Sequence, residues 1–455
     1  MVNVNNANMV DYVRAYGQKT LNEQWFNDLD GVILAQLAYL DFGLLEKAHL
    51  DDLNQLREHP DLIPDLVKNT WNPAGNQELL GQLINSRRFG QLSWHDWVAK
   101  IDVAKEQKFS AVTFDLNPQL HYIAYRGTTA TLIDWKEDLN MTFLAAIPSQ
   151  RSALHYTKRI MKHNPGNYFL GGHSKGGNLA VYVLTQLAPV EQIRVENVYS
   201  ADGPGVKTKI PLRLANKIRK FIPQASIIGL LLEPGTDYQV ITSTGSGFRQ
   251  HDPYTWTVQG DHFAVLTSTG RFSQYTQRTV SHWLAALDDA TKQEFLDSAY
   301  AILKNSDYRQ IDTLQNDWTG ALRLVRKEVG QADPEVQAKW KVVTDKLFDA
   351  LVTAALTDNV KQLQAKGEAN PVIQSASTTL KDNWSELRAR TENSALHDQA
   401  SAKLQRLRLR GQKIELKSPE KLTTASATIR NSLDHLLKRR HELDQTHDHK
   451  PTLPS

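Results

Sequence analysis

A glycine-flanked serine is the strongest chemical signal in this chain of 455 residues. It lies in the segment Tyr168-Phe-Leu-Gly-Gly-His-Ser-Lys-Gly-Gly-Asn-Leu-Ala180, which contains the pattern Gly172-x-Ser174-x-Gly176. A short apolar run typical of a buried strand precedes the serine, and apolar residues at helical spacing follow it. A nucleophile elbow requires this strand–turn–helix setting, because its tight turn projects the hydroxyl into a cleft. Ser174 is therefore the expected nucleophile of a hydrolase.

The residues around the serine support the same chemistry. Gly172 and Gly176 are expected where a Cβ would collide with neighbouring backbone. The helix that begins beyond Ser174 points its N-terminal amides at the site, so the backbone N–H of Lys175 is an expected oxyanion donor. The alternative is a glycine-rich turn that only packs closely or holds a phosphate. The order Ser174-Lys175 excludes a Walker A loop, which needs Gly-Lys-Ser/Thr.

A serine hydroxyl also needs a histidine base, which in α/β-hydrolases comes late in the chain. His251 fits best among the 15 histidines, because it lies in a loop after the last pair of predicted strands. His262 is the second candidate and His282 the third. The alternative for each is a histidine at the surface or at a helix cap. Three other histidines are excluded by their place or direction: His121, His155 and His173.

The acid that orients the base should follow a strand after the elbow. Asp202 follows the predicted strand 195–200 and precedes the turn Gly203-Pro204-Gly205, which would fix its position. The alternative is a turn-forming aspartate whose carboxylate bonds to local amides. Other candidate acids are Glu233, Asp237 and Asp252. Without an acid, a Ser–His dyad would be slow and the site vestigial.

Alternating strand and helix patterns surround these residues, which predicts a mostly parallel sheet with helices on both faces. The expected strands are 109–115, 121–125, 167–170, 195–200, 226–232 and 238–242, the first two forming a hairpin. The expected helices of this part are 151–163, 178–187 and 213–221. Gly229 is awkward in the middle of its strand and indicates a bulge or a close approach. Beyond about residue 275 only helical patterns remain, at 283–304, 313–329 and 335–366.

We therefore expect four parts in the chain. They are an N-terminal helical section packed on the core (1–106), an α/β-hydrolase core (107–285), a helical extension (286–366) and a polar, basic, partly flexible helical tail (367–455). Residues 401–455 hold 12 Lys and Arg against 6 Asp and Glu, whereas the rest of the chain is near neutral. A near-neutral body argues against nucleic-acid binding, which needs a basic face.

Composition narrows the chemistry and the location. The chain has no cysteine, so a thiolate nucleophile or a cysteine-bound metal is excluded. No cofactor and no metal site is expected, because there is no HExxH motif, and His441, His447 and His449 are interpreted as part of a solvated tail. The first residues lack a signal-peptide pattern, and no segment approaches the roughly 20 apolar residues that span a bilayer. The expected location is the cytoplasm.

Several of these stretches resemble known lipases. Ile123-Ala-Tyr-Arg-Gly-Thr and the elbow resemble class 3, fungal-type lipases. A closer resemblance, over about residues 25–285, is to an uncharacterised bacterial family of lipase-like α/β-hydrolases that is classed as a domain of unknown function. Leu37-Ala-Tyr-Leu-Asp-Phe, Asp202-Gly-Pro-Gly and Gln250-His-Asp-Pro carry it. The resemblance implies that the backbone N–H of Thr128 is the second oxyanion donor and that Gly127 lets its loop approach the elbow. Class 3 lipases carry their acid near the position of residues 222–226, where this chain has no carboxylate.

These expectations combine into a serine hydrolase that cleaves carboxylic esters, lipid acyl esters among them, through an acyl-Ser174 intermediate. His251 would be the base, Asp202 the acid, and a small-molecule or lipid ester the substrate. The alternative is a catalytically weak or inactive hydrolase-like module that binds a protein or a membrane through its helical tail. The basic stretches 403–410 and 438–440 are compatible with peripheral membrane contact and with self-association.

Overall fold

The computed structural model divides the chain into two units, 1–362 and 363–455. All residues that it describes belong to the first unit, so the predicted tail and its basic stretches lie outside them. The described residues are 7–102, 107–128, 137, 140–141, 144–226, 228–232, 237–245, 247–268, 279–280, 282–304, 306, 324, 327–332 and 334–346.

An eight-stranded mixed sheet forms the centre of the described chain, with the order β1-β2-β3-β4-β5-β6-β7-β10. The five strands from β3 to β7 are parallel, whereas β1, β2 and β10 run antiparallel to their neighbours. The strands are β1 (Ser93–Asp102), β2 (Gln107–Asn117), β3 (Leu120–Tyr125), β4 (Asn167–His173), β5 (Val195–Ala201), β6 (Ile218–Pro223), β7 (Gln239–Ile241) and β10 (Val265–Leu266). A separate short pair joins β8 (Val258–Gln259) to β9 (His262–Phe263).

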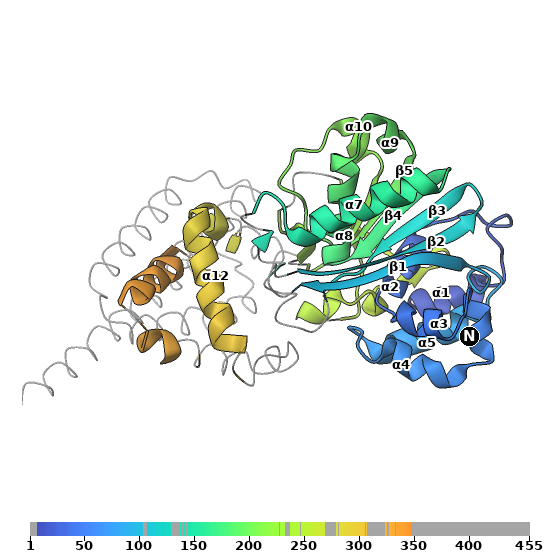
Figure 1. Cartoon of the computed structure of the whole chain (residues 1–455), viewed down its shortest axis with the longest axis horizontal. Coiled ribbons are helices and arrows are strands. Elements are labelled where there is room, and N and C mark those ends of the chain that lie inside the picture. The colour runs from blue at the N-terminus through green and yellow to red at the C-terminus, as the bar shows by residue number, and fades with distance from the viewer. Residues whose placement is uncertain are drawn as a thin grey trace, which may run out of the picture. The chain divides into compact units, whose positions relative to one another are not determined.

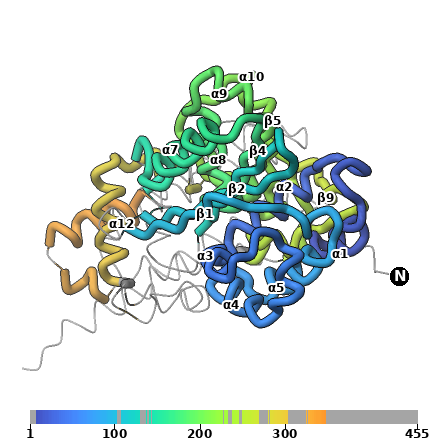
Figure 2. Tube along the Cα trace, turned by 45° about the vertical axis from the view of Figure 1, so that its right-hand side comes forward, coloured from blue at the N-terminus to red at the C-terminus, as the bar shows by residue number. Residues whose placement is uncertain are grey.

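Helices cover both faces of this sheet (Figure 1). The N-terminal helices α1 (Met9–Tyr16), α2 (Asp28–Leu37), α3 (Phe42–Lys47), α4 (Ile63–Val67) and α5 (Pro73–Leu83) lie on one side, and α7 (Pro148–His163) and α8 (Lys175–Gln186) lie on the other, as the turned view also shows (Figure 2). Further helices among the described residues are α9 (Pro189–Ile193), α10 (Leu212–Ala215) and α12 (Asp289–Lys304). Short 3-10 turns are η1 (Leu53–Arg57), η2 (Pro60–Leu62), η3 (Ile228–Leu230), η4 (Gly247–His251) and η5 (Pro253–Thr255).

Strand β3 shows how the sequence builds the two cores. All six of its residues are buried, and alternate side chains point to opposite faces. Tyr122 and Ala124 join the core beneath the N-terminal helices, whereas Ile123 and Tyr125 join the core beneath α7 and α8. A strand covered on both faces reads as a continuous apolar run, as the parallel part of the sheet requires.

The structure confirms the predicted fold class, a mostly parallel sheet flanked by helices. The hairpin predicted around Asn117-Pro118 is confirmed by the antiparallel pairing of β2 with β3. The strands predicted at 167–170, 195–200 and 238–242 correspond to β4, β5 and β7. The helices predicted at 151–163 and 178–187 correspond to α7 and α8.

Two predicted elements are wrong. Residues 213–221 were expected as a basic helix, but α10 ends at Ala215 and β6 begins at Ile218. Phe221 has no exposed surface in the centre of the sheet, so burial overrides the helical pattern of the charges. Residues 226–232 were expected as a strand, but the described part of this stretch turns through η3. In addition, β1 lies within the section 1–106, for which helices were expected.

The described part of the helical extension packs on itself. Helix α12 falls within the predicted helix 283–304, and residues 334–346 are also helical. Phe295 of α12 packs against Trp340 in a tilted arrangement with ring centroids 4.4 Å apart, and the Trp340 indole donates to the Ser298 hydroxyl. The predicted helix 313–329 lies almost wholly outside the described residues. Among the residues described, no helix combines the length and apolar character that crossing a bilayer demands.

Two helix glycines give a test of how closely α2 approaches the sheet. A Cβ on Gly31 of α2 would lie 2.5 Å from ring carbons of Tyr199, whereas one on Gly81 of α5 would meet open space. We expect Gly31→Ala to destabilise the protein by about 1–3 kcal/mol through overpacking. Gly81→Ala should be neutral or stabilising by about 0.5–1 kcal/mol, because alanine is the better helix former. Urea denaturation of both variants measures this, and equal effects would contradict the close packing.

Candidate active site

The residues that the sequence singled out lie at the carboxyl ends of neighbouring parallel strands. Ser174 directly follows β4, and Asp202 directly follows β5. Thr128 comes three residues after β3, and His251 ends the η4 turn that follows β7. The carboxyl ends of parallel strands form one edge of a sheet, which is where open α/β sheets bind their ligands.

Ser174 sits on a strained turn. Its φ of 57° and ψ of −126° are rare for a residue with a side chain. Its backbone N–H donates to the carbonyl oxygen of Ala201 at 2.9 Å, and its own carbonyl oxygen accepts from the N–H of Gly177 at 3.0 Å. A left-handed residue of this kind costs about 1–3 kcal/mol and persists because its surroundings fix it. The strand β4 thus turns into α8 within one residue.

Glycines make the close packing around this turn feasible. A Cβ on Gly172 would lie 2.3 Å from the carbonyl carbon of Gly176, and one on Gly176 would lie 2.1 Å from the carbonyl oxygen of Tyr125. A Cβ on Gly127 would lie 2.4 Å from the carbonyl oxygen of His173. These distances are too short for any side chain, so the loop after β3 lies directly on the elbow.

Asp202 and His251 are in direct contact. The Nδ1 atom of His251 lies 2.6 Å from Oδ2 of Asp202, and both side chains are almost fully buried. The other carboxylate oxygen accepts from the hydroxyl of Ser226 and, at 3.1 Å, from the backbone N–H of Gly229. Each carboxylate oxygen therefore has a donor, which offsets the cost of burying the charge.

Ser226 and Gly229 were not recognised as site residues from the sequence. The available signal was Gly229, whose place in a predicted strand indicated a close approach. The structure shows that approach, since a Cβ on Gly229 would lie 2.3 Å from Oδ1 of Asp202. The stretch that was expected as a strand instead turns to hold the carboxylate.

His173 holds the backbone of His251 in place. Its Nε2 donates to the carbonyl oxygen of His251 at 2.7 Å, so its Nδ1 is the acceptor for the hydroxyl of Tyr39 at 2.9 Å. The two imidazole rings lie 4.5 Å apart between centroids. Full burial, and then the proximity of His251, hold the pKa of His173 well below its usual value of 6.5. His173 is therefore a neutral brace, a role that its side-chain type alone did not reveal.

The side chain of Lys175 forms a buried ion pair beside the elbow. Its Nζ lies 3.0 Å from Oε2 of Glu137, and neither side chain is exposed. Oε1 of Glu137 accepts the backbone N–H of Ser149 at 2.9 Å. Removal of one partner from such a pair typically costs about 3–5 kcal/mol, because the other charge stays buried. The pair fixes the side chain of the first residue of α8, whose backbone N–H is the predicted oxyanion donor.

The segment between α4 and α5 also reaches the site. The ring of Trp71 meets that of His251 nearly edge-on, with centroids 6.3 Å apart. The side-chain amide of Asn72 donates to Asp252 at 2.8 Å, and Asp252 also caps η5 through the N–H of Tyr254. Trp71 and Tyr39 were missed in the sequence, because nothing local connects residues so far from the serine with its surroundings.

The structure separates the remaining candidates. Asp252 bonds to Asn72 and a local amide, as described above. Asp237 is exposed, and Glu233 lies outside the described residues. His262 is 66 % exposed and pairs with its neighbour Asp261, and His282 is also exposed. Thr128 is buried in the loop that packs on the elbow.

Comparisons with known proteins give one family model and several solved structures that are similar to this chain. A family model described as Mbeg1-like matches residues 83–301. No curated protein matches the chain significantly. A fungal lipase–inhibitor complex, solved as a model for interfacial activation, has a TM-score of 0.28 and 12% identity over 51% of this chain and 78% of its own. The structure of M37 lipase gives a TM-score of 0.26 and 14% identity over 46% and 70%.

The brace formed by His173 predicts a pH dependence of stability. Because the folded pKa of His173 is lowered, the unfolded chain takes up a proton near pH 6.5 that the folded chain does not. Stability should therefore fall as the pH drops below 6.5, by up to about 1.4 kcal/mol per pH unit from this residue. His173→Asn should lack this contribution. Urea denaturation of the wild type and of His173→Asn at pH 7.5 and 5.5 measures both contributions. Equal losses would contradict the prediction.

Proposed function

We propose that this protein is a serine hydrolase that cleaves carboxylic esters through an acyl-Ser174 intermediate. The observation that carries the proposal is the buried 2.6 Å contact between Asp202 and His251 at the edge of the sheet where the strained Ser174 turn lies. Ser174 and Asp202 are also connected through the backbone, because the N–H of Ser174 donates to the carbonyl oxygen of Ala201, the residue before Asp202.

The proposed reaction follows from the types of these groups. The Ser174 hydroxyl attacks the ester carbonyl carbon while Nε2 of His251 takes its proton. The carboxylate of Asp202, on Nδ1, orients the ring and stabilises the imidazolium that forms. The imidazolium then protonates the leaving alkoxide as the carbon–oxygen bond breaks. Water, deprotonated by His251, attacks the acyl-enzyme, and the carboxylic acid leaves as Ser174 regains its proton.

The tetrahedral intermediate carries an oxyanion that two backbone amides would stabilise. Lys175 supplies one N–H at the beginning of α8, where the helix dipole also favours negative charge. Thr128 supplies the other from the loop that packs on the elbow through Gly127. One such donor is commonly worth several kcal/mol of transition-state stabilisation.

Lipid acyl esters are the substrate class that we favour within the esters. The two solved relatives are lipases by their titles, and the aromatic ring of Trp71 adds apolar surface beside the proposed base. The alternative interpretation, a catalytically weak module, depended on a missing acid. The contact between Asp202 and His251 supports the enzyme instead.

Covalent labelling tests the nucleophile. A fluorophosphonate should label the purified full chain at Ser174, because an activated serine attacks phosphorus as it attacks a carbonyl carbon. Ser174→Ala and His251→Ala should abolish labelling, as judged by mass mapping of the adduct. Ser200→Ala and His262→Ala are matched controls and should keep it. The Ser200 hydroxyl is buried and lacks a hydrogen-bond partner within the described chain, so its loss is harmless.

A second outcome separates the enzyme from the inactive module. A folded wild-type chain that takes up no label would contradict the proposal and favour the module. Labelling that persists in Ser174→Ala would place the nucleophile elsewhere.

Two neighbouring carboxylates allow the acid to be tested. Asp202→Asn should lower kcat for a short p-nitrophenyl ester by a factor on the order of 10⁴, because the amide stabilises the wrong tautomer of His251. Asp252→Asn, beside the histidine in sequence, should change kcat by less than about threefold, because the Asp252 carboxylate accepts its hydrogen bonds from Asn72 and from the N–H of Tyr254. Steady-state kinetics with circular dichroism as a folding check measure both. Similar losses in the two variants would exclude the assignment of Asp202.

A further inference from the structure

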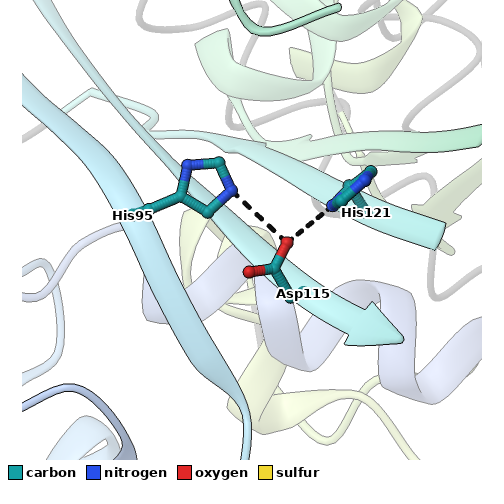
Figure 3. A group of neighbouring side chains, drawn as sticks. All are labelled: His95, Asp115 and His121. Atoms are coloured by element: carbon teal, nitrogen blue, oxygen red, sulfur yellow. Dashed lines mark hydrogen bonds and ion pairs between the residues drawn. The ribbon is translucent and has the colours of Figure 1, made fainter. Parts of the chain in front are cut away.

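A second group of histidine and carboxylate side chains lies at the other end of the sheet. His95 of β1, Asp115 of β2 and His121 of β3 point toward one another from three adjacent strands (Figure 3). Nδ1 of His121 lies 2.6 Å from Oδ1 of Asp115, and Nε2 of His95 lies 3.3 Å from the same oxygen. His121 pairs with Tyr168, six residues before Ser174, so the cluster is about 20 Å from the proposed nucleophile.

In each imidazole ring, the outer nitrogen, which does not face Asp115, lies against a hydrogen-bond acceptor. Nδ1 of His95 lies 2.6 Å from the carboxylate of Asp96. Nε2 of His121 lies 3.1 Å from the carbonyl oxygen of Pro165. A carbonyl oxygen only accepts, so this nitrogen of His121 must carry its hydrogen. Histidines that bind metals are oriented by such partners, which also fix the tautomer.

The inner nitrogen of each ring, which is the one on the side of Asp115, faces a carboxylate oxygen that also offers lone pairs. When the rings are neutral, Nε2 of His95 and Nδ1 of His121 are acceptors, and both face Oδ1 of Asp115. Three acceptors in convergence repel one another unless protons or a metal cation lie between them. We propose that His95, Asp115 and His121 bind a divalent transition-metal ion of the Zn²⁺ type. This proposal is independent of the proposed hydrolase activity.

The dimensions of the cluster suit a tetrahedral ion. The three ligand atoms all lie within 4.8 Å of one another. In a tetrahedral zinc site with bonds of about 2.0–2.1 Å, ligand atoms lie about 3.4 Å apart. The separation of His95 from Asp115 already has this value, and His121 needs to withdraw by less than about 1 Å. Two imidazoles and one carboxylate are a common zinc ligand set and leave a fourth position for water.

The local backbone and exposure also favour binding. The register of β1 against β2 shifts between His95 and Val98, and Asp96 within this bulge has a φ of 54°. Bulges of this kind re-aim side chains. The side chains of His95 and Asp115 are about a third exposed, at 28% and 31%, so an ion can enter from solvent. Arg159 also contacts Asp96, at 2.8 Å, and steadies the outer carboxylate.

An ion at this position would tie the edge of the sheet together. It would join β1, the outermost strand, to β2 and β3, and His121 extends the connection to the loop after α7 through Pro165. The sequence led us to expect no metal, because it lacks closely spaced paired histidines. The three ligands are instead brought together by strand pairing, with Asp115 directly opposite His121.

Metal binding to the full chain tests the proposal. After dialysis against EDTA and then buffer, calorimetric titration with Zn²⁺ should show one ion bound per chain, with a rise in Tm. His95→Ala should weaken binding by at least about 100-fold. Asp96→Asn, which keeps a residue tolerant of positive φ, should weaken it by about 10–100-fold. Co²⁺ in place of Zn²⁺ should give the visible spectrum of a tetrahedral site.

Matched controls separate this cluster from other histidines. His262→Ala removes an exposed histidine that also neighbours an aspartate, and it should bind Zn²⁺ as the wild type does. A triple alanine variant at His441, His447 and His449 should also keep the site. The proposal is overturned if the wild type binds no stoichiometric Zn²⁺. Protons between the histidine nitrogens and Asp115 would then take the place of the ion. It is equally overturned if His95→Ala and Asp96→Asn, both folded by circular dichroism, bind like the wild type.

Discussion

The turn at Ser174 is the constraint from which much of this fold follows. Strand β4 has to reverse into α8 within one residue, at a backbone conformation that only its neighbours can hold. The hydrogen bond to Ala201 fixes it to β5, and the contact of Gly176 with the backbone of Tyr125 fixes it to β3. The close packing around this one turn therefore requires glycine at all three positions, 127, 172 and 176. Strain at a single residue is supported by three strands and a helix.

Asp202 has a similar position at the end of the neighbouring strand, β5. It also follows its strand directly, and its φ is 45°. A buried carboxylate needs donors for both oxygens, and Ser226 and Gly229 provide two of them, with His251 as the third. This need explains why the apolar stretch after β6 turns through η3 instead of continuing as a strand. The position of the Asp202 carboxylate and the shape of that loop are one structural feature.

Local patterns and distant contacts differ in how far the sequence predicts them. The strand–turn–helix around Ser174 is local, and so are the hairpin and the alternation that gave the fold class. Asp202 and His251 were selected by chain order, and the structure brings them into contact across 49 residues. Tyr39 and Glu137 were missed because their partners are set by packing of whole elements. The helix predicted at 213–221 failed because burial of Phe221 outweighs a charge pattern that suits either element.

The two histidine–carboxylate groups differ in the direction of their hydrogen bonds, and this difference distinguishes the proposed base from the proposed metal ligands. The carboxylate of Asp202 accepts its other hydrogen bonds from Ser226 and Gly229, and Nδ1 of His251 gives it a third donor, as the proposed base requires. At Asp115 the outer nitrogen of each histidine is already committed to an acceptor, Asp96 or the Pro165 carbonyl. When the rings are neutral, the inner nitrogens are left as acceptors that face a carboxylate. An arrangement of donors favours proton transfer, whereas an arrangement of acceptors favours a cation.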